Sequence, residues 1–105
     1  MDSQSIAKTI LQQLGGRKFI TMTGSSNFGG GIDEKSNPYL IMRLKRNKSG
    51  ARYLRITLNV MDTYDMKFMK LDKNDNLQSV SEHNGIYCDM LQDIFTEVTG
   101  FYTHL

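Results

Sequence analysis

Residues 39–60 have the sequence YLIMRLKRNKSGARYLRITLNV and contain two segments in which apolar and polar side chains alternate. Alternation with a period of two is typical of a β-strand that buries one of its faces. Between the segments, Lys48-Ser49-Gly50 supplies a short turn with a glycine for the left-handed position. We therefore predict an antiparallel hairpin formed by residues 39–46 and 52–60. The side chains expected to face the core are Leu40, Met42, Leu44, Leu54, Ile56, Leu58 and Val60.

The length of the turn predicts which residues of the two strands lie opposite each other. The predicted pairs are Met42–Ile56, Leu44–Leu54, Arg43–Arg55 and Lys45–Tyr53. Apolar residues then meet on the core side. On the other side Arg43 faces Arg55, and like charges directly opposite each other are destabilising. We therefore expect an anion near this face, supplied by an acid of the same chain such as Asp65 or by a partner.

Helical periodicity is present at both ends of the chain. Residues 4–14 carry apolar side chains at spacings of three and four, with Ser3 or Ser5 as the cap and Gly15-Gly16 as the end. Residues 83–98, HNGIYCDMLQDIFTEV, have the same periodicity and precede Gly100. We predict a helix in each segment.

The remaining segments predict further strands and one loop. RKFITMT, residues 17–23, is rich in β-branched and aromatic residues and favours a strand, whereas GSSNFGGG, residues 24–31, favours a flexible loop. Residues 64–70 favour another strand, and residues 77–80 a short edge strand. The chain of 105 residues has the size of one domain. We predict a single two-layer α+β domain over residues 1–105, in which both helices cover one face of a four-stranded antiparallel meander.

The composition limits the classes of protein to which the chain can belong. With 39% hydrophobic and 23% charged residues, it lies in the normal range of globular proteins. No apolar run approaches the roughly 18 residues of a membrane-spanning helix. The N-terminal residues lack the pattern of a signal peptide, and Cys88 is the single cysteine, which excludes an intramolecular disulfide. We expect a cytoplasmic protein.

Charge is distributed unevenly, although the net charge is only +2. Residues 39–61 contain six Lys or Arg and no acid, whereas residues 74–105 contain five acids and no Lys or Arg. One interpretation of the basic stretch is an ordinary solvated face, and the other is a surface that binds phosphate groups or an acidic protein. The candidate partner-binding residues of this basic face are Arg43, Lys45, Arg46, Lys48, Arg52, Tyr53 and Arg55.

Two further groups are candidate contact residues. Asp89, Asp93 and Glu97 recur at four-residue intervals, which is typical of a solvated helix surface. The alternative for this acidic face is a row of carboxylates that imitates a nucleic-acid backbone. In the glycine-rich loop, Asn27 and Phe28 lie at the expected tip, where an exposed phenylalanine anchors a partner.

The sequence carries no recognisable catalytic or metal-binding motif. The glycine-rich segment lacks the Lys and Ser/Thr of a phosphate-binding loop. Cys88 and His83 lack the surroundings of a nucleophile and its base, and Cys88, His83 and His104 do not have the spacing of a zinc site. We expect no cofactor, no metal and no enzymatic activity.

Three segments of the chain resemble small proteins carried by bacteriophages, prophages and metagenomic mobile elements. They are LGGRKFITMTGSSNF (14–28), RNKSGARYLRITLNVMDTYDMKF (46–68) and DMLQDIFTEVTGFYT (89–103). In size and charge segregation the chain is similar to anti-CRISPR proteins, which block host effectors by stoichiometric binding. The resemblance implies an inhibitor that acts in a bacterial host cell on a defence protein, such as Cas9 or its guide RNA complex. The alternatives are a single-stranded nucleic-acid-binding accessory protein that uses the basic sheet face, and a homodimeric module.

Overall fold

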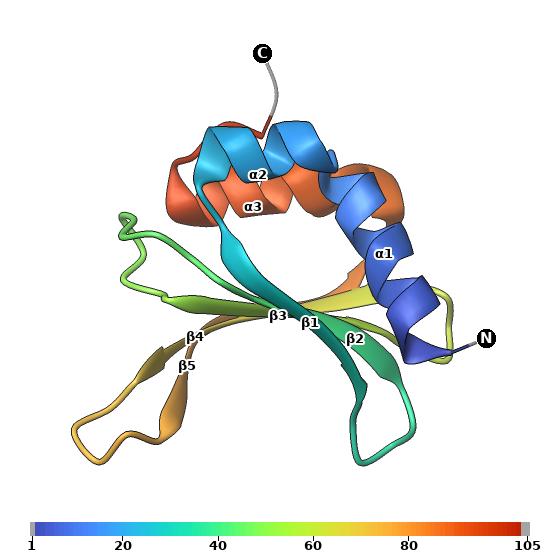
Figure 1. The fold of residues 1–105 in the computed structure, drawn as a ribbon. Helices are drawn as coiled ribbons and strands as arrows, with labels where there is room; N and C mark the ends of the chain where they lie inside the picture. Colours follow the sequence, from blue (N-terminus) through green and yellow to red (C-terminus); the bar gives the residue numbers. More distant parts are fainter. Residues whose placement is uncertain (1, 104–105) are drawn as a thin grey trace.

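The computed structural model describes residues 2–103 and consists of a layer of helices on one face of an antiparallel sheet (Figure 1). The five strands follow one another in the order β1-β2-β3-β4-β5. The elements are α1 (Ser3–Leu14), α2 (Arg17–Thr23), β1 (Ser26–Ile32), β2 (Pro38–Arg43), β3 (Tyr53–Leu58), β4 (Tyr64–Leu71), β5 (Leu77–Ile86), a 3₁₀ turn η1 (Cys88–Met90) and α3 (Leu91–Thr99). The predicted α+β class is confirmed. The sheet has five strands rather than the predicted four, and the helical layer has three α-helices rather than two.

Helix α1 confirms the helix predicted for residues 4–14, although its cap differs. The carboxylate of Asp2, rather than a serine, accepts the Ser5 N–H at 2.7 Å. This bond favours the charged carboxylate and lowers the pKa of Asp2. At the other end, Gly15 has φ 123° and its N–H donates to Gln12, which ends the helix.

Residues 17–23 form helix α2, so the predicted first strand is wrong. Gly15 and Gly16, both at positive φ, reverse the chain, and a helical turn then brings Phe19 and Thr23 onto the same buried face. The Thr23 hydroxyl donates to the Phe19 carbonyl at 2.8 Å, and Phe19 packs edge-on against Phe95 of α3, with ring centroids 4.9 Å apart. Burial of this face outweighs the β-propensity of the sequence.

The glycine-rich segment forms strand β1 rather than a flexible loop. Its glycines are needed because both faces of the strand are closely covered. A Cβ on Gly30 would lie 2.9 Å from the Ala7 Cβ of α1, and a Cβ on Gly31 would lie 2.5 Å from the Tyr39 hydroxyl on the opposite face. Glycine therefore allows the close approach of a helix on one side and an aromatic ring on the other.

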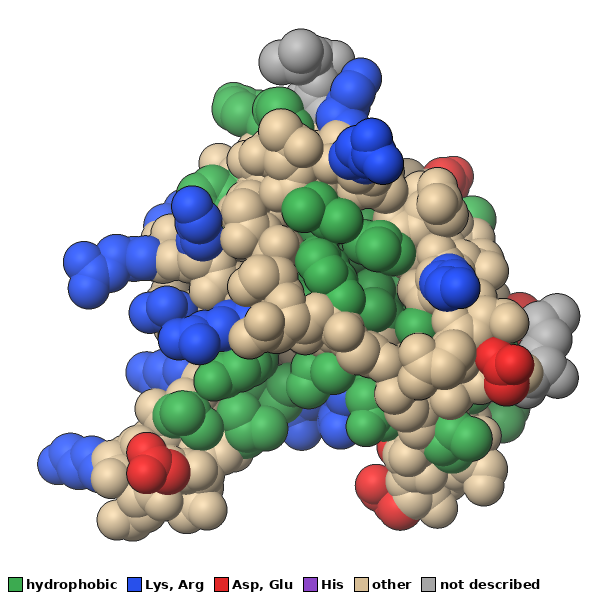
Figure 2. Space-filling view, in the orientation of Figure 1, with side chains coloured by type: hydrophobic (Ala, Val, Ile, Leu, Met, Phe, Trp, Pro, Cys, Tyr) green, Lys and Arg blue, Asp and Glu red, His purple; other side chains and the backbone are tan. Residues whose placement is uncertain are grey.

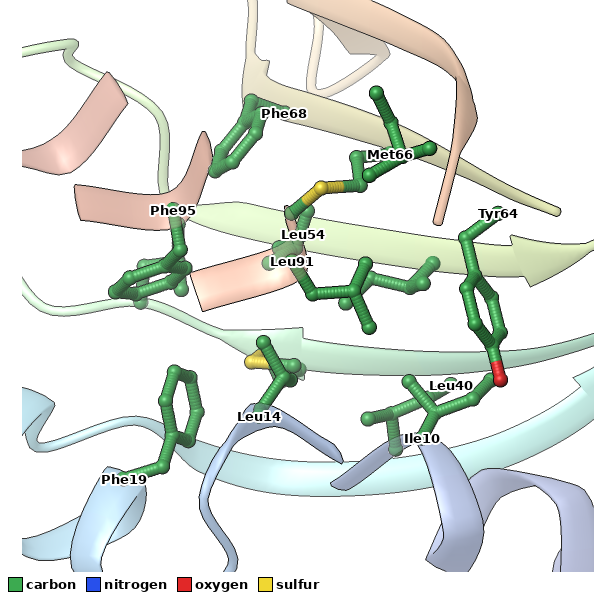
Figure 3. Close-up of a cluster of buried hydrophobic side chains, with 14 of the residues drawn as sticks. Ile10, Leu14, Phe19, Leu40, Leu54, Tyr64, Met66, Phe68, Leu91 and Phe95 are labelled. Atoms are coloured by element: carbon green, nitrogen blue, oxygen red, sulfur yellow. The ribbon is translucent and has the colours of Figure 1, made fainter. Parts of the chain in front are cut away.

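The core lies between the two layers. The predicted alternation is confirmed from Leu40 to Ile56, whose expected inward residues are buried. Leu58 is only partly buried, and Val60, also expected to face the core, is exposed because β3 ends at Leu58. Figure 3 shows side chains from α1, α2 and α3 pointing toward those of β2, β3 and β4. The largest fully buried side chains are Phe19, Phe68, Phe95, Ile10, Leu14, Met42, Leu54, Ile56, Met66, Leu91 and Thr103.

The predicted register of the β2–β3 hairpin is wrong by two residues. Arg43 lies opposite Tyr53, not Arg55, and Met42 lies opposite Leu54. The connection is longer than three residues, because the last backbone bond before it joins Leu44 N–H to the Arg52 carbonyl at 2.7 Å. A shift of two keeps every side chain on its predicted face. The predicted like-charge pair is therefore absent from this hairpin.

Strand β5 is longer, and the last helix shorter, than predicted. The edge strand expected over residues 77–80 extends to Ile86, where it pairs with Tyr64. His83 pairs with Met66 of β4, so residues 83–86 of the predicted helix belong to the sheet. Gly100, at φ 83°, ends α3 as expected.

The sheet face away from the helices is uncovered, and the turns β1–β2 and β4–β5 extend away from the helices on either side of it (Figure 1). Within residues 2–103, no helix has the length and apolar character needed to cross a membrane.

Candidate functional site

A cavity of about 370 Å³ lies where β2, the β2–β3 connection, β3 and the end of β4 meet. Its lining residues are Arg43, Arg46, Asn47, Gly50, Arg52, Tyr53, Lys70 and Leu71. Four of these side chains are cationic and none is acidic. Figure 2 shows Lys and Arg side chains gathered on the side of the molecule where Figure 1 places the β2–β3 connection. We call this site the cationic cavity.

The β2–β3 connection is held in shape mainly by Asn47. Its amide Nδ2 donates to the carbonyls of Lys45 and Ala51 at 2.8 and 2.7 Å, and its Oδ1 accepts the Ser49 N–H at 3.1 Å. Gly50 has φ 82°, as predicted, and Ala51 is fully buried. These bonds fix the backbone that carries Arg46 into the cavity wall.

Two backbone bonds attach this connection to the rest of the molecule. Lys48 N–H donates to the Thr99 carbonyl at the end of α3, and Arg52 N–H donates to the Met69 carbonyl of β4 at 2.8 Å. The site is thus anchored to both layers. An anchored backbone suits ligand binding because little loop ordering remains to be done on association.

The cations of the cavity lack carboxylate partners. Between residues 2 and 103 the structure has one ion pair, Lys67–Glu82, at 3.5 Å and away from this site. Of the cavity cations, Arg52 makes a hydrogen bond, from Nε to the Leu44 carbonyl at 3.3 Å. Four like charges around one concave surface produce a positive potential that attracts an anion.

The predicted basic face separates into two groups in the structure. Arg43, Arg46, Arg52 and Tyr53 line the cationic cavity together. The other three lie elsewhere. The side chain of Lys45 crosses Gly24. The side chain of Lys48 lies beside Gly100, where its positive charge interacts favourably with the carbonyl end of α3. Arg55 lies over the Tyr39 ring, 5.4 Å from its centroid, as in a cation–π contact.

Arg55 also lines a second cavity of about 300 Å³ on the uncovered sheet face. The charged residues there are Asp33, Glu34, Lys35, Arg55, Asp65, Lys67 and Glu82. Since both acids and bases line it, the uncovered face is not uniformly basic. The expected excess of positive charge is concentrated at the end of the sheet.

Sequence reasoning missed four residues of the cationic cavity: Asn47, Gly50, Lys70 and Leu71. Lys70 and Leu71 belong to β4, and the β3–β4 pairing of Tyr53 with Met69 brings them to the site. Their contribution depends on strand register, for which the local sequence carries no clear signal.

The other candidate residues lie outside the cationic cavity. Asp89 is in η1, whereas Asp93 and Glu97 lie one turn apart on α3, and all three are exposed. The loop tip predicted at Asn27 and Phe28 is wrong, because both belong to β1. There Phe28 packs partly buried against the core, since β1 lies beneath α1.

Cys88 is exposed, and His83 packs edge-on against Phe68 with ring centroids 5.9 Å apart. No three His, Cys, Asp or Glu side chains in the described range 2–103 are grouped as metal ligands. His104 lies outside that range. No protein-family model, curated protein or solved structure matches the chain.

Proposed function

We propose that this protein binds single-stranded nucleic acid through the cationic cavity. The observation that carries the proposal is the convergence of Arg43, Arg46, Arg52 and Lys70 on one concavity that contains no carboxylate. Arginine and lysine neutralise backbone phosphates, and this term dominates the affinity of most nucleic-acid-binding proteins.

Tyr53 and Leu71 favour a single strand over a duplex. Both line the same cavity as the cations, so a ligand that fills it meets phosphate-binding groups and apolar surface together. A duplex keeps its bases stacked inside and presents phosphates on a convex surface, whereas an unpaired base can stack on an aromatic ring. The cavity volume of about 370 Å³ lies in the range of small-ligand sites.

Fluorescence anisotropy with a labelled oligonucleotide of about ten residues tests this proposal. Arg46→Glu should weaken binding at least about tenfold at low salt. The matched control is Arg17→Glu, the same charge change at an exposed position of α2, which should alter binding by less than about twofold. The wild type should also prefer the single strand to a hairpin duplex of equal charge. No binding at low salt, or equal effects of the two variants, contradicts the proposal.

A second candidate function is inhibition of a bacterial defence effector, with a guide-loaded Cas9 as the target that the resemblance suggests. The separation of charge favours it, because Asp89, Asp93 and Glu97 recur at four-residue intervals, are all exposed and do not line the cationic cavity. In this case the protein acts as a non-enzymatic phage or mobile-element inhibitor in the host cytoplasm. Its acidic residues occupy a positively charged channel of the nuclease.

Purified protein in molar excess should then suppress target cleavage by guide-loaded Cas9. Asp93→Lys with Glu97→Lys should abolish the inhibition. Glu34→Lys, which reverses an exposed acid in the β1–β2 turn, should leave it intact. Unchanged cleavage with the wild-type protein rules out this target.

A further inference from the structure

Three hairpin turns of this protein have the same structure. They span residues 33–37, 59–63 and 72–76. In each, the first residue is Asp or Asn, its N–H donates to the carbonyl of the fifth, and its side-chain oxygen accepts the N–H groups of the third and fifth. The fourth residue has positive φ in all three, between 62° and 66°. The second and third residues form the exposed tip of each turn.

The tips differ in chemistry although the turns do not. Two tips are polar, Glu34-Lys35 and Lys73-Asn74, and one is apolar, Val60-Met61. Val60 is 84% and Met61 78% exposed, although Val60 was predicted to face the core. Since the same backbone geometry is built with polar tips, the turn itself does not require the apolar pair. An exposed apolar pair on a rigid turn is suited to insertion into an apolar site.

The chain also contains an apolar cavity of suitable size, about 100 Å³, between α1 and β1. Its lining residues are Gln4, Ala7, Lys8, Leu11, Phe28, Gly29, Gly30 and Leu40. Since a water molecule occupies about 30 Å³ in the liquid, this space suits a side chain of a few heavy atoms. Methionine is unbranched and adapts readily to such a space.

Charge and position fit this pairing. The tip is followed by the exposed Asp62, and the cavity is bordered by the exposed Lys8. Tyr64, which follows the turn, links this part of the sheet to α1, because its hydroxyl donates to Gln13 at 2.6 Å. Figure 1 shows the β3–β4 turn and the N-terminal part of α1 at the same end of the molecule. A two-fold arrangement can therefore use the tip and cavity of both copies.

We propose that Val60-Met61 of one copy inserts into the α1–β1 cavity of a second copy, with Asp62 facing Lys8, and that the exchange is reciprocal. This contact leaves the cationic cavity and the uncovered sheet face free. Two short tips bury less than the roughly 800 Å² per partner of a stable interface. The dimer is therefore weak, with a dissociation constant between about 100 μM and 1 mM.

Sedimentation equilibrium from about 10 μM to 1 mM tests the proposal. The weight-average mass should rise from 12.0 kDa toward twice that value. Val60→Lys with Met61→Asn copies the tip of the turn at residues 72–76, so it preserves the fold and should remain monomeric throughout. The matched control, Lys73→Ser with Asn74→Ser, alters the tip of that equivalent turn and should associate like the wild type.

Charge reversal tests the cavity side of the contact. Lys8→Glu should weaken association at least about fivefold, whereas Lys18→Glu, an exposed lysine of α2 outside the cavity, should have little effect. Thermal unfolding verifies that each variant is folded. A wild-type protein that stays monomeric at the highest concentration overturns the proposal. So does association that survives the tip change or responds equally to both lysine reversals.

Discussion

The substitution Gly30→Ala tests the packing of α1 on the sheet. An added Cβ would lie 2.9 Å from the Ala7 Cβ and 3.2 Å from the Ser3 carbonyl oxygen. Gly30 is not at positive φ, so the alanine itself causes no backbone strain there. Forced repacking costs about 1–3 kcal/mol, and the smaller entropy of the unfolded chain offsets about 0.4–1 kcal/mol. We expect a net loss of about 1.3 kcal/mol in the free energy of unfolding, the difference between the midpoints of these two ranges.

Gly29→Ala is the control for this substitution. Its added Cβ would meet only the Ile41 methyl group, at the ordinary contact distance of 3.8 Å, and its φ is also not positive. Guanidinium denaturation should show Gly29→Ala as stable as the wild type or more so. Adding Ala7→Gly to Gly30→Ala removes the contact partner, so the double variant should be at least about 1 kcal/mol more stable than the sum of the single effects. Equal stability of the two alanine variants, or strict additivity, refutes the packing argument.

Three further predictions concern single side chains. Burial raises the pKa of Tyr64. The stabilisation of the fold by the neutral phenol is therefore complete below the pKa of the unfolded state, near 10, and is lost as the pH rises through the folded-state pKa. Tyr64→Phe should cost about 1 kcal/mol at pH 7 by removing the bond to Gln13, and alkaline denaturation should show this difference shrinking. The pKa of Asp2 is lowered. Its charged carboxylate therefore stabilises the fold when the pH is above the unfolded-state pKa near 4, and this stabilisation is lost as the pH falls through the folded-state pKa. Asp2→Ala should lower the unfolding temperature at pH 7 but not near pH 2. Asn47→Ala should cost about 1–3 kcal/mol in urea denaturation, because it removes the two hydrogen bonds to the Lys45 and Ala51 carbonyls, each worth about 0.5–1.5 kcal/mol.

The parts of the fold that could be predicted from the sequence depend on local patterns. The alternation in residues 39–60 and the periodicity of residues 4–14 each determine a buried face without reference to distant residues. Helix α2 was missed because Phe19 is buried by packing on Phe95, a contact that local propensity does not represent. Strand β1 was missed because Gly30 serves the close approach of Ala7, which is far away in sequence.

The candidate site was predicted in part for the same reason. Arg43, Arg46, Arg52 and Tyr53 are close in sequence and converge in space. The register around them was wrong because the side chain of Asn47, rather than a tight backbone turn, closes the connection. Lys70 reaches the cavity through strand pairing, and Arg55 is drawn away to the ring of Tyr39. Both depend on contacts across the sheet.

The salt dependence of oligonucleotide binding tests the role of the cationic cavity most directly. If all four cavity cations contact phosphates, the logarithm of the binding constant should fall with the logarithm of salt concentration with a slope of about −3 for a single strand. Arg46→Ala should make the slope less steep by about 0.7, whereas Arg17→Ala should leave it unchanged. A wild-type slope near zero, or an unchanged slope for Arg46→Ala, would contradict the account.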